Sequence, residues 1–208
     1  MDVEVPEKVI RSLRDFGVHI ATVTLGILIA FAFEGARTWW HDRNLVREAE
    51  ANLASEMADN RKDLEDALRV IPGTRSDIDG DLAAIEALLA PEKNAGATSA
   101  ARKRRPSFRT MKVLFSDASR STAESMGALG HMRYAAVKRY AEIYSVQREV
   151  MRLQEHFFDQ AAVIPQGELG ALDPATLQSR RESLLVLRQH LGDVESMGRD
   201  LLVMYRSR

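Results

Sequence analysis

The sequence predicts an all-α protein in which an N-terminal transmembrane helix continues into an antiparallel bundle of about four to five helices. Residues 16–33 form an uncharged run of 18 residues, 13 of them apolar. In the rest of the 208-residue chain, apolar residues recur at three- and four-residue steps, and no strand-like alternation extends beyond a few residues. We therefore expect a short N-terminal flank at 1–15, a transmembrane helix at 16–36 and a soluble bundle at 37–208.

The apolar run is long enough to act as a membrane anchor. At 1.5 Å per residue it covers about 27 Å, close to the ~30 Å of a bilayer's hydrocarbon core. Arg14 at one end, and Trp39 and Trp40 at the other, are expected to anchor the helix in the two interfaces. A cleavable signal peptide is the alternative, because a basic flank precedes the run and Ala30-Phe31-Ala32 resembles a cleavage site. The length of the run and the paired tryptophans beyond it favour a retained anchor.

Small residues recur on one face of the predicted span. Thr22, Gly26 and Ala30 lie four residues apart, so they share a stripe that would let a second helix approach closely. Small residues are also common in membrane helices that do not associate. Three basic residues flank the span on each side, but those on the short N-terminal side lie close to it. We therefore expect the N-terminus inside the cell and the bundle outside.

The helix is expected to continue beyond the membrane, because apolar residues at helical spacing follow it from residue 45 to residue 71. Asn60 lies within this apolar stripe, where an amide either fixes register or oligomeric state or hydrogen-bonds within the bundle. Pro72-Gly73 predicts the end of the helix. The sequence from Ser76 to Asp79 predicts the capped start of a second helix, and Pro91 predicts its end.

Residues 91–106 have no apolar periodicity and are predicted to form a flexible loop. This loop carries the strongest concentration of positive charge in the chain: Arg102, Lys103, Arg104 and Arg105. Three interpretations are open, namely a solvated loop, a contact with anionic lipid or an acidic protein, and a contact with nucleic acid. Nucleic acid is the least favoured, because few aromatic residues lie nearby to stack on bases and the net charge of the chain is −1.

Three further helices complete the predicted bundle. A short helix at 119–129 is expected to end at Gly130, and a long helix begins at about residue 132. After a turn at 165–170, Asp173-Pro174 predicts an N-cap followed by proline at the first position of the last helix. The long helix carries three tyrosines that we expect at the edge of the core, with a ligand pocket beside them as a second interpretation: Tyr134, Tyr140 and Tyr144.

No residue pattern predicts catalysis, a cofactor or a metal site. The chain has no cysteine, no phosphate-binding loop and no nucleophile elbow, and no histidine has an acidic residue three positions upstream, as the di-metal sites of helical bundles require. Asp77, Asp79 and Asp81 have the spacing of a calcium loop, but Leu82 and Leu88 stand where that loop needs glycine and glutamate. We therefore expect a protein that is not an enzyme.

The order of several motifs resembles that of an uncharacterised family of bacterial single-pass membrane proteins. In this chain the motifs are Gly26-Ile27-Leu28-Ile29-Ala30, Trp39-Trp40, Leu53-x-x-Glu56-Met57-x-x-Asn60, Gly127-Ala128-Leu129 and Arg139-Tyr140-Ala141-Glu142-Ile143-Tyr144. The resemblance extends over about residues 10–70 and 120–150. It implies a retained anchor and no activity. With the orientation expected from the basic flanks, an anchor in the bacterial inner membrane would place the bundle in the periplasm.

Two hypotheses about function follow. The first is a non-enzymatic, membrane-anchored helical protein that acts by associating with itself or by binding another membrane or envelope protein. The second is a sensory or small-molecule-binding bundle tethered to the membrane, with its pocket between the tyrosine-bearing helix and the last helix. The lipid bilayer is a partner under both hypotheses.

Overall fold

The computed structural model describes residues 13–90, 98–105, 111–165 and 167–206. These residues form helices and connecting segments without a β-strand: α1 (Leu13–Leu89), α2 (Thr98–Arg102), α3 (Ala118–Ser125), α4 (Ala128–His131), α5 (Tyr134–Ala162), the 3-10 helix η2 (Leu169–Ala171) and α6 (Pro174–Arg206). The predicted all-α class is therefore confirmed. The N-terminal flank up to residue 12, and the helix end predicted at Pro91, lie outside the described residues.

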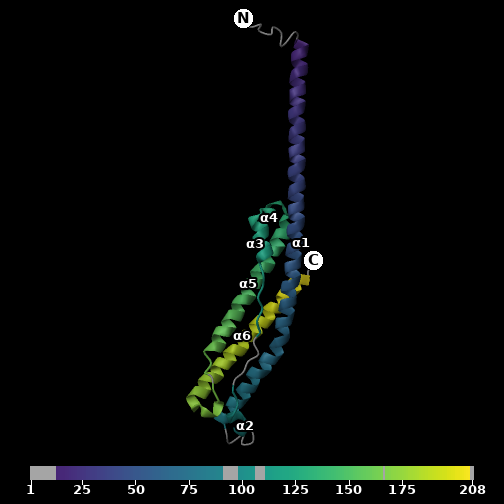
Figure 1. The fold of residues 1–208 in the computed structure, drawn as a ribbon. Helices are drawn as coiled ribbons and strands as arrows, with labels where there is room; N and C mark the ends of the chain where they lie inside the picture. Colours follow the sequence, from purple (N-terminus) through teal and green to yellow (C-terminus); the bar gives the residue numbers. More distant parts are fainter. Residues whose placement is uncertain (1–12, 91–97, 106–110, 166, 207–208) are drawn as a thin grey trace, which may run out of the picture.

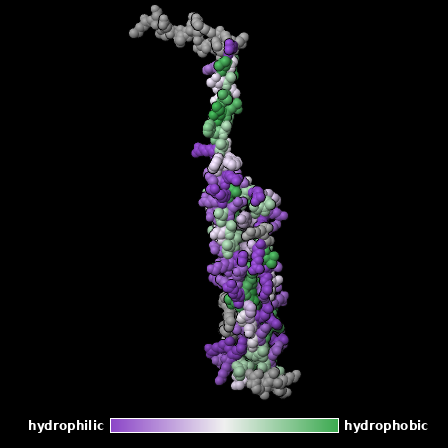
Figure 2. All heavy atoms as spheres, turned by 90° about the vertical axis from the view of Figure 1, so that its right-hand side faces the viewer, coloured by the Kyte–Doolittle hydropathy of each residue, from purple (hydrophilic) through white to green (hydrophobic). Residues whose placement is uncertain are grey.

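The longest element, α1, has 77 residues and reaches from the apolar segment to the far end of the bundle. Its N-terminal part stands alone as a rod, whereas its C-terminal part packs against the other helices (Figure 1). Figure 2 shows a band of apolar side chains on the rod. Every side chain from Phe16 to Trp40 is exposed. This part of α1 is long and apolar enough to cross a membrane.

The predicted helix end at Pro72-Gly73 is wrong, because α1 continues through both residues and through the restart expected at Ser76. Proline removes one main-chain hydrogen bond and bends a helix without necessarily ending it. Here Pro72 is exposed, while Ile71 and Ile78 on either side of it are completely buried. Apolar packing thus holds both halves of the helix in place, and α1 bends in the half that carries Pro72 (Figure 1).

The body of the bundle consists of α1, α5 and α6, and α6 packs against both of the others (Figure 1). Ion pairs join α1 to α6 in antiparallel order: Glu86 with Arg181, Asp79 with Arg188, and Glu65 with Arg206. The core between the three helices contains apolar side chains with essentially no exposure, among them Leu53, Leu64, Ile85, Leu184, Leu187 and Leu191. Burial of this apolar surface is the main force that holds the bundle together.

A return segment carries the chain back from the far end of the bundle toward the rod. Residues 111–117 have no regular secondary structure, with Met111 and Val113 buried and Leu114 exposed. The segment leads into α3 and α4, which lie at the end of the bundle nearest the rod (Figure 1). The helix expected over 119–129 is broken earlier than Gly130, at Gly127, whose φ of 75° is left-handed and favours glycine.

The start of the last helix is confirmed. Asp173 Oδ1 accepts hydrogen bonds from the main-chain N–H groups of Ala175 and Thr176, both at 3.0 Å, as an N-cap should. The grouping expected for the three tyrosines is wrong in part. Tyr144 is buried, whereas Tyr134 is 82% exposed because it opens α5 at the end of the bundle.

Candidate functional site

The small-residue face of the apolar rod is accessible along its length. Thr22, Gly26 and Ala30 are all exposed. The Thr22 hydroxyl donates to the Val18 carbonyl at 2.9 Å, so its hydrogen bond is satisfied within the helix. No atom outside the helix lies within 4 Å of the position that a Cβ on Gly26 would take. A second helix could therefore approach this face without displacing any described part of the chain.

The predicted interface anchors lie at the two ends of the rod. Arg14 is exposed near its start. Trp39 and Trp40, which are 56% and 63% exposed, meet edge to face with ring centroids 6.0 Å apart. The guanidinium carbon of Arg43 lies 5.6 Å from the centre of the Trp39 ring, within the range of a cation–π interaction.

The basic cluster is more ordered than the flexible loop that was expected. Arg102 ends the helix α2, which falls inside the predicted loop, and Lys103 follows it. Arg104 pairs with Asp81 of α1, and Arg105 Nη2 lies 2.9 Å from a carboxylate oxygen of Glu168. Two of the four charges are therefore engaged within the chain. Residues 91–97 and 106 of the predicted loop lie outside the described residues.

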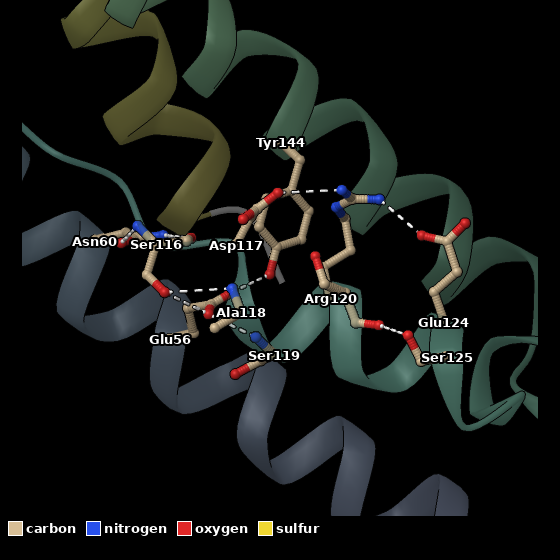
Figure 3. Close-up of polar contacts among 11 residues, drawn as sticks. Glu56, Asn60, Ser116, Asp117, Ala118, Ser119, Arg120, Glu124, Ser125 and Tyr144 are labelled. Atoms are coloured by element: carbon tan, nitrogen blue, oxygen red, sulfur yellow. Dashed lines mark hydrogen bonds and ion pairs between the residues drawn. The ribbon is translucent and has the colours of Figure 1, made fainter.

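The buried carboxylate of Glu56, which the sequence indicated only as part of a motif, joins three helices. Glu56 of α1 accepts hydrogen bonds from the hydroxyl of Ser116 and the N–H of Ser119, both at 2.8 Å. Its other carboxylate oxygen accepts from the hydroxyl of Tyr144 on α5 (Figure 3). Glu56 thus caps α3 and ties it to α1 and α5. A detectable signal was its position four residues before Asn60 on the apolar stripe of α1.

The protonation states of Glu56 and Tyr144 suit a structural role. Burial acts to raise the pKa of Glu56, but the hydrogen bonds from Ser119, Tyr144 and Ser116 together outweigh it and hold the pKa below its ordinary value. Burial, with the neighbouring Glu56 charge, raises the pKa of Tyr144. Both pKa values are therefore shifted further from neutral pH, so neither group is suited to exchange a proton at that pH.

Two side-chain amides hold the return segment. Asn60 of α1 donates to the Ser116 carbonyl at 2.8 Å and accepts from the Ser116 N–H at 2.9 Å. Gln154 of α5 accepts from the Val113 N–H at 2.7 Å and donates to the Val113 carbonyl at 3.2 Å. Each amide satisfies both main-chain groups of one residue. Of the two roles expected for Asn60, the structure shows the hydrogen bond within the bundle.

The place proposed for a ligand pocket, between α5 and α6, contains a direct polar contact. Gln147 Nε2 of α5 donates to the hydroxyl of Tyr205 on α6 at 2.6 Å. Burial raises the pKa of Tyr205 to about 12, so the hydroxyl stays protonated at neutral pH. This contact ties the end of α6 to α5.

A second buried polar group lies toward the far end of the bundle. Arg180 of α6 has no exposed surface, and its three guanidinium nitrogens have no hydrogen-bond partner among the described residues. Asp81 of α1, also buried, pairs through one oxygen with Arg104, and its other oxygen has no donor within the described part of the chain. The cluster holds two cations around one carboxylate.

Comparisons with family models, with curated proteins and with solved structures gave no match. The function proposed below therefore rests on the sequence and on the geometry of the chain.

Proposed function

We propose that this chain is a single-pass protein of the bacterial inner membrane that acts without catalysing a reaction, by associating with a second copy or with another membrane or envelope protein. The observation that carries the proposal is the apolar rod. The segment from Phe16 to Phe33 is exposed along its whole length, and its helix continues into the bundle without a break. Transfer of this surface from water into lipid is strongly favourable.

The proposed contact within the membrane is the face formed by Thr22, Gly26 and Ala30. Small residues at four-residue spacing let two helix backbones approach closely, and close packing drives association in lipid, where the hydrophobic effect between helices is absent. A dimer of the span would bring two copies of α1 together at the membrane, and each copy would position its own bundle.

Cysteine crosslinking in intact membranes tests this association, because the chain has no cysteine of its own. Gly26→Cys places a thiol on the small-residue face. Leu28→Cys is the matched control, since it is equally exposed to lipid but lies about 160° round the helix. We expect an adduct with a second copy, or with a partner protein, at position 26 only. No adduct at position 26, or equal adducts at both positions, would refute the proposed face.

The proposed orientation places the N-terminus in the cytoplasm and the bundle in the periplasm. Fusion of alkaline phosphatase and of a fluorescent protein to the C-terminus tests it, since the phosphatase is active only after export and the fluorescent protein matures in the cytoplasm. We expect an active phosphatase fusion and a dark fluorescent fusion. The opposite pattern would place the bundle in the cytoplasm.

A further inference from the structure

We propose that the end of the bundle nearest the rod binds the phosphate of a phospholipid headgroup, in a cleft between α1 and the junction of α4 with α5. The proposal rests on the membrane anchoring proposed above. The cleft has a volume of about 730 Å³. Aromatic and basic side chains form much of its lining: Trp39, Trp40, Arg43, Arg47, His131 and Arg133.

The position of the cleft along α1 matches the headgroup layer. With the hydrocarbon core covering residues 16–36, Trp39 lies about 5 Å and Arg43 about 10 Å beyond its edge along the helix axis. The Cα–Cβ bonds of a helix tilt toward its N-terminus, which here is the direction of the bilayer. The side chain of Arg43 therefore leans back toward the phosphates. Because α4 lies beside this part of α1 (Figure 1) and Arg133, at the start of α5, lines the cleft, both face the same layer.

The arginines of the cleft have no carboxylate partner among the described residues, unlike several arginines elsewhere in the bundle. Within the described parts of the chain, no ion pair involves Arg43, Arg47 or Arg133. Two acidic residues also line the cleft, against its three arginines, and neither forms an ion pair with them. Asp42 lies 3.5 Å from His131 Nδ1, and the charge of Glu50 acts on Tyr140.

Arginines further along the bundle show the contrast. Arg61 lies 2.9 Å from Glu65, and both Arg75 and Arg199 lie within 2.6 Å of Glu195. Guanidinium groups bind the planar edge of a carboxylate and the oxygens of a phosphate equally well, often through two parallel hydrogen bonds. Positive charge concentrated at the end of the bundle nearest the rod is therefore matched to an anion from outside the chain.

The backbone adds a further positive contribution. Arg133 is the N-cap residue of α5, and its side chain makes no capping hydrogen bond. The first N–H groups of this 29-residue helix therefore point toward the cleft end of the bundle, where the helix dipole favours a negative charge. The exposed Trp39 and Trp40 rings beside them suit the amphipathic boundary of a bilayer, so a lipid phosphate fits the site better than a free anion.

Binding of lipid to the full-length chain in detergent micelles, followed by native mass spectrometry, tests the proposal without requiring insertion into a membrane. The probes are phosphatidylglycerol, the diacylglycerol with the same acyl chains, and glycerol 3-phosphate. The test variant combines Arg43→Gln, Arg47→Gln and Arg133→Gln. The control variant combines Lys62→Gln, Lys112→Gln and Arg148→Gln, which removes the same charge from exposed positions outside the cleft.

We expect the wild-type chain and the control to bind phosphatidylglycerol equally. The test variant should bind it roughly 100-fold more weakly, at about fivefold for each arginine. Equal binding by the two variants, equal binding of diacylglycerol, or full displacement of the lipid by an equal concentration of glycerol 3-phosphate would overturn the proposal. Both variants should show unchanged far-ultraviolet circular dichroism. Release of the wild-type chain from membranes by alkaline extraction would instead refute the anchoring, which this binding assay does not measure.

Discussion

Arg180 offers the sharpest test of how the interior of the bundle is stabilised. Its guanidinium is fully buried and unpaired within the described residues, and burial lowers its pKa while the charge of Asp81 opposes that shift only in part. An unsatisfied buried polar group typically destabilises a protein by about 1–3 kcal/mol, and a charged one by more. Arg180→Met keeps an unbranched apolar side chain and removes the charge, while the ion pair between Asp81 and Arg104 remains. We therefore expect Arg180→Met to raise the free energy of unfolding by about 1–2 kcal/mol.

The reverse change has the opposite effect. Asp81→Asn removes the carboxylate whose charge acts on both Arg104 and Arg180, and we expect the free energy of unfolding to fall by about 3–5 kcal/mol. In the double variant Asp81→Asn/Arg180→Met, the buried uncompensated charge is gone. The double variant should therefore be more stable than Asp81→Asn alone, and the stabilities of the wild type, both single variants and the double variant together give the coupling energy of the pair.

Urea unfolding of the full-length chain in detergent, followed by far-ultraviolet circular dichroism, measures these differences. Arg148→Met is the matched control, because Arg148 lies exposed on α5, and a change of less than about 0.5 kcal/mol is expected there. A loss of more than about 1 kcal/mol in Arg180→Met would refute the reasoning. It would mean that the guanidinium has hydrogen-bond partners in solution, such as buried water molecules.

Three other features of the chain, namely the Glu56 carboxylate, the two side-chain amides and Pro72, also give testable predictions. Glu56→Gln should lower the free energy of unfolding by about 1–3 kcal/mol at neutral pH. Because the folded-state pKa of Glu56 is lowered, this loss of stability is fully present above the ordinary carboxyl pKa and shrinks as the pH falls through the folded-state pKa. Urea unfolding of both chains at several pH values measures the loss. A loss that does not change with pH would contradict the prediction. Asn60→Ala should speed amide hydrogen exchange at Ser116, and Gln154→Ala should speed it at Val113, while exchange in α6 stays unchanged as the reference. Unchanged exchange at Ser116 and Val113 would show that the two side-chain amides do not hold the return segment. Pro72→Ala restores a main-chain donor and should stabilise the chain by about 1–3 kcal/mol in urea unfolding. A loss of stability would contradict this and would show that α1 needs its bend to pack on α6.

The features that sequence predicts well are those set by local chemistry. The apolar stripe of α1 is one, since Leu53, Leu64 and Ile71 are all buried as their helical spacing indicates. The N-cap at Asp173 is another, because its hydrogen bonds join residues within three positions of each other. Both follow from the periodicity of a helix and from the unpaired N–H groups at its start.

The features that sequence misses depend on residues far apart in the chain. The local rule for proline predicts a helix end at Pro72, but packing against α6, more than 100 residues later, keeps α1 helical. Glu56 and Arg180 lie on the apolar stripes of their helices, so periodicity indicates their burial, but it does not indicate their partners, which come from α3, α5 and Asp81. The return segment, which has no regular secondary structure, has no sequence signal of its own, because its hydrogen bonds come from side chains on α1 and α5.

The continuity of α1 also sets how far the protein extends from the bilayer and how it moves there. If residues 16–36 span the membrane, the remaining 53 residues of α1 extend roughly 80 Å along the helix axis before any allowance for its bend. A change of about 20° in the tilt of the span, within the range that membrane helices show, would sweep the far end sideways by about 27 Å. The tip that carries α2 and the α5–α6 turn would therefore behave as the end of a lever, and a small motion between helices in the membrane would become a large displacement outside it.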